Sequence, residues 1–284
     1  MSSLDACMTD QEYTFLKQKI RRLTGIDLEA YKSTQMRRRL NSFIGQSRSV
    51  TIPDFCRKIE TNAALLENLR TYMTINVSEF FRDEDSFTSL KNTVLPSLVR
   101  SRSRLTIWSA GCSCGQEPYS IAILLDMLGG TAATSRILAT DIDAGALRIA
   151  AAGGPYGHES LRNVGPSVLA RYFAPVPGGY LVNDRIRRRV EFRPQNLLDD
   201  RFDEGFDLII CRNVTIYFTN EAKFQLNKRF HTSLRDGGVL FVGGTETTMD
   251  MQTIGFRQLA PSFFVKDQPS TARAMSRVLA GARS

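Results

Sequence analysis

The chain has 284 residues, of which 42% are hydrophobic and 23% charged, a composition typical of a folded globular protein. This length suits one large domain and a small one. The clearest apolar run, residues 121–125, ends at Asp126 and is far shorter than the roughly 20 residues of a membrane-spanning helix. Because the N-terminus also lacks the features of a secretory signal, we expect a cytoplasmic protein without direct membrane insertion.

Charge and cysteine content narrow the partners and ligands. The net charge of +8, from 37 Lys and Arg against 29 Asp and Glu, favours an anionic partner, but charge alone does not distinguish a nucleic acid from an acidic protein. The five cysteines are scattered, as expected for reduced thiols. Neither His158 nor His231 follows Cys112 and Cys114 at a finger-like spacing, so we expect no metal site.

The first part of the chain shows helical patterns. Thr9 and Glu12 have the spacing of a capping box, and apolar residues then recur at helical intervals until Gly25. A second, strongly basic helix is expected across residues 32–48, and further helical patterns continue to about Ile75. These patterns predict a small all-helical N-terminal domain over residues 1–75, followed by a linker over residues 76–90.

After one more helical stretch the pattern changes to short apolar strands separated by helices, which predicts an α/β domain with a doubly wound parallel sheet over residues 91–266. A small antiparallel hairpin is expected as an insertion at about residues 178–193. From residue 267 the chain becomes polar and small, which predicts a mobile tail over residues 267–284. The main strands are expected at residues 105–109, 137–140, 206–211 and 239–242.

A glycine turn follows the first of these strands. Gly111 and Gly115 flank it, and a helix begins directly afterwards, an arrangement that lets a cofactor approach the backbone. Taken alone, this signal is weak. Ser113 stands where a dinucleotide fingerprint requires glycine, and the turn has no basic residue to meet a pyrophosphate. An NAD site is therefore disfavoured.

Acidic residues mark the ends of two adjacent elements. Asp141 ends the second strand, where a carboxylate can accept hydrogen bonds from both hydroxyls of a ribose. Asp143 is better explained as the cap of the next helix. Glu117 begins the helix after the glycine turn, where the helix dipole already favours a negative charge; alternatively it contacts a cationic cofactor group, which suits a sulfonium and an amino acid better than a phosphate.

Three segments make the chain resemble the CheR family of chemotaxis receptor methyltransferases: NVSEFFR at 76–82, GQEPYS at 115–120 and CRNVTIYF at 211–218. The resemblance implies a helical N-terminal domain, a doubly wound Rossmann-like methyltransferase domain and a small antiparallel β insertion. It also implies an enzyme that transfers the methyl group of S-adenosylmethionine to glutamate side-chain carboxylates of methyl-accepting chemotaxis receptors, leaving S-adenosylhomocysteine and a glutamate methyl ester.

The resemblance further implies a set of site residues. Serine at position 78 replaces the family's usual threonine and keeps the hydroxyl, whereas Cys114 replaces a serine or threonine and puts any hydroxyl hydrogen bond from the turn in doubt. We expect Arg82 to position the substrate carboxylate, unless it forms a linker salt bridge with Glu79 or Asp83. We expect Tyr217 to offer a hydroxyl at the pocket rim, unless it is a plain core tyrosine. The residues expected to contact the cofactor are Asn76, Ser78, Arg82, Gly111, Glu117, Asp141, Asn196, Leu197, Asn213 and Val214.

The basic residues Arg37, Arg38 and Arg39 are expected to dock on the acidic faces of the receptor's cytoplasmic helical bundle, although most charge runs are simply solvated. We expect a monomer. A nucleic-acid methyltransferase is disfavoured, because the strand ending at Cys211 is followed by Arg212 and Asn213 rather than the Asp/Asn-Pro-Pro-aromatic tetrad that holds a flipped base. A non-catalytic, cofactor-binding docking scaffold remains the other alternative.

Overall fold

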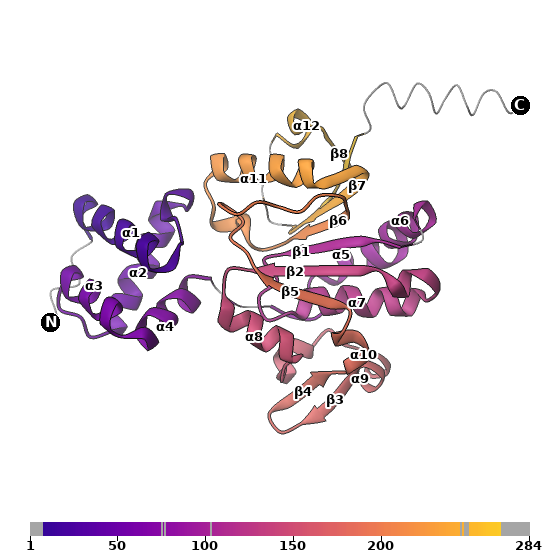
Figure 1. Cartoon of the computed structure of the whole chain (residues 1–284), viewed down its shortest axis with the longest axis horizontal. Helices are drawn as coiled ribbons and strands as arrows, with labels where there is room; N and C mark the ends of the chain where they lie inside the picture. The colour runs from indigo at the N-terminus through magenta and orange to yellow at the C-terminus, as the bar shows by residue number, and fades with distance from the viewer. Residues whose placement is uncertain are drawn as a thin grey trace, which may run out of the picture.

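The computed structural model describes residues 8–74, 76, 78–102, 104–244, 246 and 250–267. A group of helices at the N-terminus stands beside an α/β domain (Figure 1). The helical segments, with short 3-10 or π turns marked η, are α1 (Asp10–Thr24), η2 (Leu28–Ala30), α2 (Ser33–Gln46), α3 (Ile52–Thr61), α4 (Ala63–Thr74), α5 (Glu84–Ser89), η3 (Leu90–Val94), α6 (Leu95–Ser101), α7 (Gln116–Leu128), η4 (Gly130–Thr134), α8 (Ala144–Ala152), η5 (His158–Leu161), α9 (Pro166–Tyr172), α10 (Asp184–Arg187), η6 (Thr215–Tyr217), α11 (Asn220–Ser233) and α12 (Met251–Ile254). The strands are β1 (Thr106–Ala110), β2 (Arg136–Asp141), β3 (Phe173–Val176), β4 (Gly179–Val182), β5 (Val190–Pro194), β6 (Phe206–Cys211), β7 (Leu234–Val242), β8 (Phe256–Ala260) and β9 (Phe263–Lys266).

The first helix begins and ends where the sequence predicts. The Glu12 backbone N–H donates to the Thr9 hydroxyl oxygen at 3.3 Å, and the Thr9 N–H donates to the Glu12 carboxylate at 2.9 Å, so the capping box is complete. Gly25 ends the helix in the left-handed conformation, with φ of 75°. Apolar side chains of α1 to α4 bury a core of their own, among them Leu16, Ile20, Leu40 and Phe55. The predicted all-helical N-terminal part is thus confirmed.

The α/β domain contains a seven-stranded sheet in the order β5-β2-β1-β6-β7-β9-β8. The first five strands of this order are parallel, and β9 pairs antiparallel with β7 and with β8. The strand order reverses at β1, because β2 lies on one side of it and β6 on the other, so the carboxyl ends of these strands form a crevice suited to ligands. The predicted doubly wound sheet is confirmed. Among the described helices, none is both long and apolar enough to cross a membrane.

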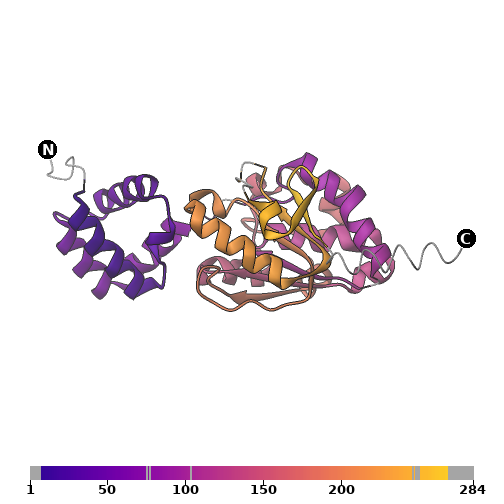
Figure 2. The ribbon, with the colours of Figure 1, turned by 90° about the horizontal axis from the view of Figure 1, so that it is seen from above.

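Alternate residues of the central strands pack into two different hydrophobic cores, one on each face of the sheet. Ile107 and Ile210 pack on one face with residues of α7, and Trp108 and Ile209 pack on the other face with Phe230 of α11. All six residues of β6 are buried, as expected for a strand covered on both faces. Figures 1 and 2 show the helices of the N-terminal part placed beside one end of this layered domain rather than over its faces.

The predicted hairpin at residues 178–193 is correct in kind but wrong in its partners. The antiparallel pair consists of β3 and β4, in which Phe173 faces Val182. Val190 and Phe192 instead belong to β5, which pairs parallel with β2 in the main sheet. A short strand with alternating apolar residues can belong to a hairpin or to the main sheet, and the pattern does not tell the two apart. Helix α10 connects the hairpin to β5 of the main sheet. Strands β8 and β9 were not predicted, and tail residues 268–284 lie outside the described residues.

A buried carboxylate holds the hairpin region against the sheet domain. The Asp126 side chain, at the end of α7, has no exposed surface and accepts hydrogen bonds from Arg185 at 2.5 Å and from the Tyr172 hydroxyl at 3.0 Å. Arg189 and Arg171 lie 3.1 and 3.5 Å from the same carboxylate. One acid therefore joins α7 to α9, to α10 and to the segment leading into β5.

Replacing this acid tests its role. Asp126→Asn removes the charge but keeps the shape, and we expect a loss of about 1.5–3 kcal/mol in the free energy of unfolding, the value for hydrogen bonds to a charged group. The larger penalty of a fully buried pair is not expected, because the arginines reach solvent. Chemical denaturation is the measurement, with Asp184→Asn, which breaks only exposed pairs with Arg187 and Arg188, as the control. Equal losses in both variants would contradict this role.

Candidate active site

A pocket of about 1030 Å³, counting the space open to solvent at its mouth, lies at the carboxyl edge of the sheet where the two parts of the protein meet. Its lining mixes apolar rings with a few polar and charged side chains, as in sites for small molecules and cofactors. The structure brings all the predicted cofactor residues and the predicted rim tyrosine into its lining. They are Asn76, Ser78, Arg82, Gly111, Glu117, Asp141, Asn196, Leu197, Asn213, Val214 and Tyr217.

The glycine turn after β1 packs directly on the loop after β6. Gly111 has φ of 81°, and its N–H donates to the Thr140 carbonyl at 2.8 Å. A Cβ at this position would overlap Cγ2 of Val214. Only glycine allows this conformation and this approach together, so two walls of the pocket come from segments about a hundred residues apart.

Asp141 ends β2 and points its carboxylate at the pocket. One oxygen accepts the Ser113 N–H at 2.7 Å and the other accepts the Asp143 N–H at 2.9 Å, which leaves lone pairs on both oxygens. Burial raises the pKa of this carboxyl, although the two backbone hydrogen bonds act in the opposite direction. A desolvated carboxylate with free acceptor positions is suited to a pair of ligand hydroxyls.

Glu117 does more than complement the dipole of α7. Its carboxylate accepts the Ser109 hydroxyl at 2.8 Å and lies 3.6 Å from the guanidinium of Arg212. Burial raises the pKa of Glu117 even though the Arg212 charge and the Ser109 hydrogen bond lower it. The pocket thus holds two desolvated acids, Asp141 and Glu117, and both would be stabilised in their charged forms by a cationic ligand.

Arg212 is a site residue that sequence reasoning missed. Its buried guanidinium pairs with Asp83, lies against Glu117 and donates to the Arg82 carbonyl at 3.1 Å. It also stands 4.6 Å from the centre of the Phe241 ring, in a cation–π contact. Arg212 therefore ties the linker to the sheet. Its position directly after a fully buried strand was the available signal.

Glu246 is a second missed residue. Its carboxylate accepts the backbone N–H groups of Thr215 at 2.8 Å, of Val214 at 3.1 Å and of Gly243 at 2.6 Å. These bonds fix the loop in which Asn213 takes a left-handed conformation, with φ of 61°. Nothing in the sequence singled out Glu246, because it lies beyond the last predicted strand and acts on a loop some thirty residues earlier.

The N-terminal part supplies one wall of the pocket. The Tyr31 ring meets the Phe218 ring edge to face, with centroids 5.0 Å apart, and both residues line the pocket. The Lys32 N–H donates to the Tyr217 carbonyl at 2.9 Å, and the Thr219 N–H donates to the Ala30 carbonyl at 2.8 Å. These contacts place the start of α2 beside the rim tyrosine.

The linker carboxylates that could have paired with Arg82 have other partners. Glu79 pairs with Arg162 at 2.6 Å, and Asp83 pairs with Arg212. The predicted docking residues, by contrast, lie outside the pocket lining. The guanidinium of Arg37 pairs with Asp10, that of Arg39 donates to the Tyr72 carbonyl, and Arg38 is exposed.

The pocket suits an adenosyl ligand with a cationic end. Gln195, another missed residue, lines it, and its side-chain carbonyl is buried without a hydrogen-bond partner among the described residues, which leaves an acceptor for an exocyclic amine. Asn196 donates to the Gly25 carbonyl at 3.3 Å, and Leu197 is buried. The two acids can bind the hydroxyls and the cationic end of S-adenosylmethionine, and the unpaired acceptor can bind its exocyclic amine. A phosphate group would instead be repelled by the two acids.

The sheet and this pocket define an S-adenosylmethionine-dependent methyltransferase. The family model described as the CheR methyltransferase SAM binding domain matches residues 76–262, and the model of the CheR methyltransferase all-alpha domain matches residues 11–74. The chain is 38% identical to a chemotaxis protein methyltransferase of Listeria monocytogenes over 90% of this chain and 98% of that protein. It is 40% identical to chemotaxis protein methyltransferase 1 of Pseudomonas aeruginosa over 78% of this chain and 85% of that protein. The protein belongs to the CheR methyltransferase family.

Cofactor binding should release protons in mildly acidic solution. Burial holds the pKa values of Asp141 and Glu117 above their ordinary range, and a bound cation favours the carboxylate form, so their pKa values fall on binding. Protons are then released between the raised and the lowered values, and affinity weakens as pH falls through that window. Calorimetry in buffers of different ionisation enthalpy, from about pH 5 to neutral, measures this release. An equal proton count at all these pH values would contradict the assignment of both acids.

Proposed function

We propose that the protein transfers the methyl group of S-adenosylmethionine to glutamate side chains of methyl-accepting chemotaxis receptors in the cytoplasm. The observation that carries this proposal is the convergence of two largely buried acids, Asp141 and Glu117, and the linker residue Arg82 on one pocket. The relatives that match 90% and 78% of the chain are chemotaxis protein methyltransferases. The pocket opens to solvent at its mouth, which supports a substrate side chain presented by another protein.

The site residues divide the work of holding the cofactor. Asp141 would accept hydrogen bonds from the ribose hydroxyls, and Glu117 would face the cationic methionine end. The adenine and the methionine chain would be surrounded by the other predicted contacts, which all line the pocket: Asn76, Ser78, Gly111, Asn196, Leu197, Asn213 and Val214. When bound, S-adenosylmethionine supplies the electrophilic methyl group.

A glutamate substrate requires no general base, because its carboxylate is already ionised at neutral pH. The enzyme must instead align and dehydrate this nucleophile, and orientation alone contributes about 7–11 kcal/mol in favourable cases. Arg82 is suited to this task, since its planar guanidinium can hold a carboxylate with two parallel hydrogen bonds. Tyr217 places a hydroxyl at the rim, where the substrate enters. The product is a glutamate methyl ester with S-adenosylhomocysteine.

The decisive test is transfer of radiolabelled methyl groups to purified cytoplasmic fragments of chemotaxis receptors. We expect label on glutamate side chains, released as methanol by mild base as methyl esters are, and lost when the acceptor glutamates are replaced by alanine. Asp141→Ala should weaken cofactor binding about tenfold or more, the effect of losing a charged hydrogen bond. Cofactor binding without any transfer would favour the non-catalytic scaffold, and label on nucleic acid would favour the other alternative; either result would reject the proposal.

The contacts of the three predicted docking arginines support only one of them as a free docking residue. Arg37 and Arg39 make contacts within the N-terminal part, including rings 4.3 and 4.6 Å from their guanidinium carbons, so reversing their charge would disturb folding. Arg38 is exposed on α2, whose first turn adjoins the pocket rim. We therefore propose Arg38 as the arginine of this group that meets the acidic face of the receptor bundle.

Charge reversal at this position tests docking without disturbing the core. Arg38→Glu should raise KM for the receptor roughly two- to fivefold, in line with the modest energy of an exposed ion pair, and should leave cofactor affinity unchanged. Arg57→Glu is the matched control, because Arg57 is an exposed arginine on α3 of the same helical part. Equal effects of the two variants on KM would show that overall charge, not a specific docking contact, is responsible.

A further inference from the structure

Asp143 makes more contacts than a helix cap requires. One carboxylate oxygen accepts the N–H groups of Gly145 at 2.8 Å and Ala146 at 3.1 Å, which caps α8. The other oxygen accepts the Thr74 hydroxyl at 3.1 Å and the Asn76 side-chain amide at 2.5 Å. Asp143 is completely buried. Its second oxygen thus serves the end of α4 and the linker rather than its own helix.

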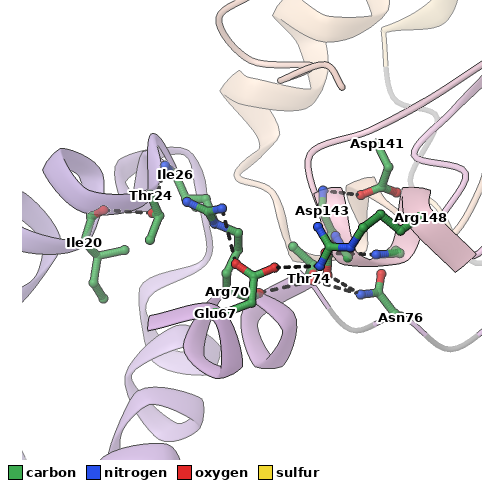
Figure 3. Close-up of polar contacts among 12 residues, drawn as sticks. Ile20, Thr24, Ile26, Glu67, Arg70, Thr74, Asn76, Asp141, Asp143 and Arg148 are labelled. Carbon is green, nitrogen blue, oxygen red and sulfur yellow. Dashed lines mark hydrogen bonds and ion pairs between the residues drawn. The ribbon is translucent and has the colours of Figure 1, made fainter. Parts of the chain in front are cut away.

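These contacts close a ring of hydrogen bonds around Asp141, the acid proposed to bind the ribose (the ribose acid). Asn76 uses its amide group on Asp143 and accepts the Ser113 hydroxyl on its carbonyl oxygen at 3.2 Å. The Ser113 N–H donates to one oxygen of Asp141, and the Asp143 N–H donates to the other. Both oxygens of Asp141 are therefore oriented by residues that the linker contact holds. Figure 3 shows Thr74 and Asn76 directed toward Asp143, with Asp141 just beyond it.

A second polar link joins the same two elements. Glu67 of α4 lies 3.9 Å from the guanidinium of Arg148 in α8 and 3.4 Å from that of Arg70 in its own helix. These side chains are labelled beside Asp143 in Figure 3. This outer link is partly exposed and weak, so the buried hydrogen bonds of Asp143 are the main polar connection that the structure shows between the end of α4 and the start of α8.

We propose that Asp143 is a positioning residue. Its hydrogen bonds hold the interdomain linker against the cofactor pocket and thereby fix the orientation of the Asp141 carboxylate. The inference rests on the proposed ribose contact of Asp141. It goes beyond helix capping, because a cap alone requires only one carboxylate oxygen. The end of the N-terminal helical part and the ribose acid then form one hydrogen-bonded unit, and a change at the linker alters cofactor affinity.

A swap of two side chains isolates the linker contact from the cap. In Asp143→Asn the amide oxygen can still cap α8, since asparagine caps as well as aspartate does, but its NH2 group then faces the NH2 group of Asn76. In Asn76→Asp two carboxylates face each other. The double variant D143N/N76D restores one donor and one acceptor, keeps an acceptor for the Ser113 hydroxyl, and has the net charge of the native chain. The four proteins form a double-mutant cycle.

The readout is the affinity for S-adenosylhomocysteine by calorimetry, which needs no methyl acceptor. We expect each single variant to bind about tenfold more weakly, as for one lost charged hydrogen bond, and the double variant to recover most of the affinity. Thr51→Ala, which removes the cap of α3 far from the ring, should lower stability without changing affinity. Native affinity in Asp143→Asn, or a double variant no better than the weaker single one, would overturn the proposal.

The proposal and its premise fail in different ways. If Asp141→Ala binds S-adenosylhomocysteine as tightly as the native chain does, the ribose assignment is wrong, and Asp143 then has no ribose-binding acid to position. If Asp141→Ala is weak but the swap gives no recovery, the acid binds ligand and Asp143 only caps its helix. Failure of methyl transfer to receptor fragments would affect neither result, because the binding assay uses no receptor.

Discussion

The site depends on keeping two carboxylates ionised in a place where burial disfavours their charge. Asp141 and Glu117 have raised pKa values for this reason, and leaving such groups without partners would cost several kcal/mol. Backbone N–H groups at the strand ends compensate Asp141, and Arg212 with Ser109 compensates Glu117. What remains is unused acceptor capacity directed at the pocket, which a hydroxyl-rich cation can satisfy.

This constraint explains why both parts of the protein are needed for one pocket. The sheet alone would leave the carboxyl ends of β1 and β2 open to water, which would solvate the acids and reduce their interaction with a ligand. Tyr31 and Phe218 close one side, and the linker with Asn76 and Arg82 closes another. Ile142, directly after Asp141, packs against the core of the helical part. The acid is thus held between two hydrophobic cores.

Sequence alone could predict what depends on neighbours in the chain. The capping box at Thr9, the left-handed Gly25 and the fully buried strand β6 are local patterns, and the structure confirms them. The strand partner predicted for Val190 was wrong, because alternation of apolar residues indicates which side chains are buried but not which strand pairs with them. Arg212 and Glu246 were missed for a related reason: their roles depend on contacts with residues far away in the chain. The cofactor residues were named from the resemblance, and the structure places them in one pocket.

Backbone strain gathers around this pocket. Four non-glycine residues near it have left-handed backbones: Phe81 and Ser113, with φ of 52° and 50°, and Asp83 and Asn213, each with φ of 61°. Such conformations persist only where surrounding contacts hold them, and the structure shows such a contact for each of these residues or for its loop. The Phe81 N–H donates to the Ser120 hydroxyl at 3.0 Å, and the Ser113 N–H donates to Asp141 at 2.7 Å.

The remaining two strained residues are held by the side chains that sequence reasoning missed. Asp83 pairs with Arg212, and the loop of Asn213 is fixed by the hydrogen bonds of Glu246 to the next two residues. Strain held by buried charged groups cannot relax without exposing or unpairing those groups, which is costly. The pocket walls are therefore set before any ligand arrives. The proposed transfer to an ionised carboxylate would depend on alignment rather than on proton transfer, and such chemistry requires a site whose walls are already in place.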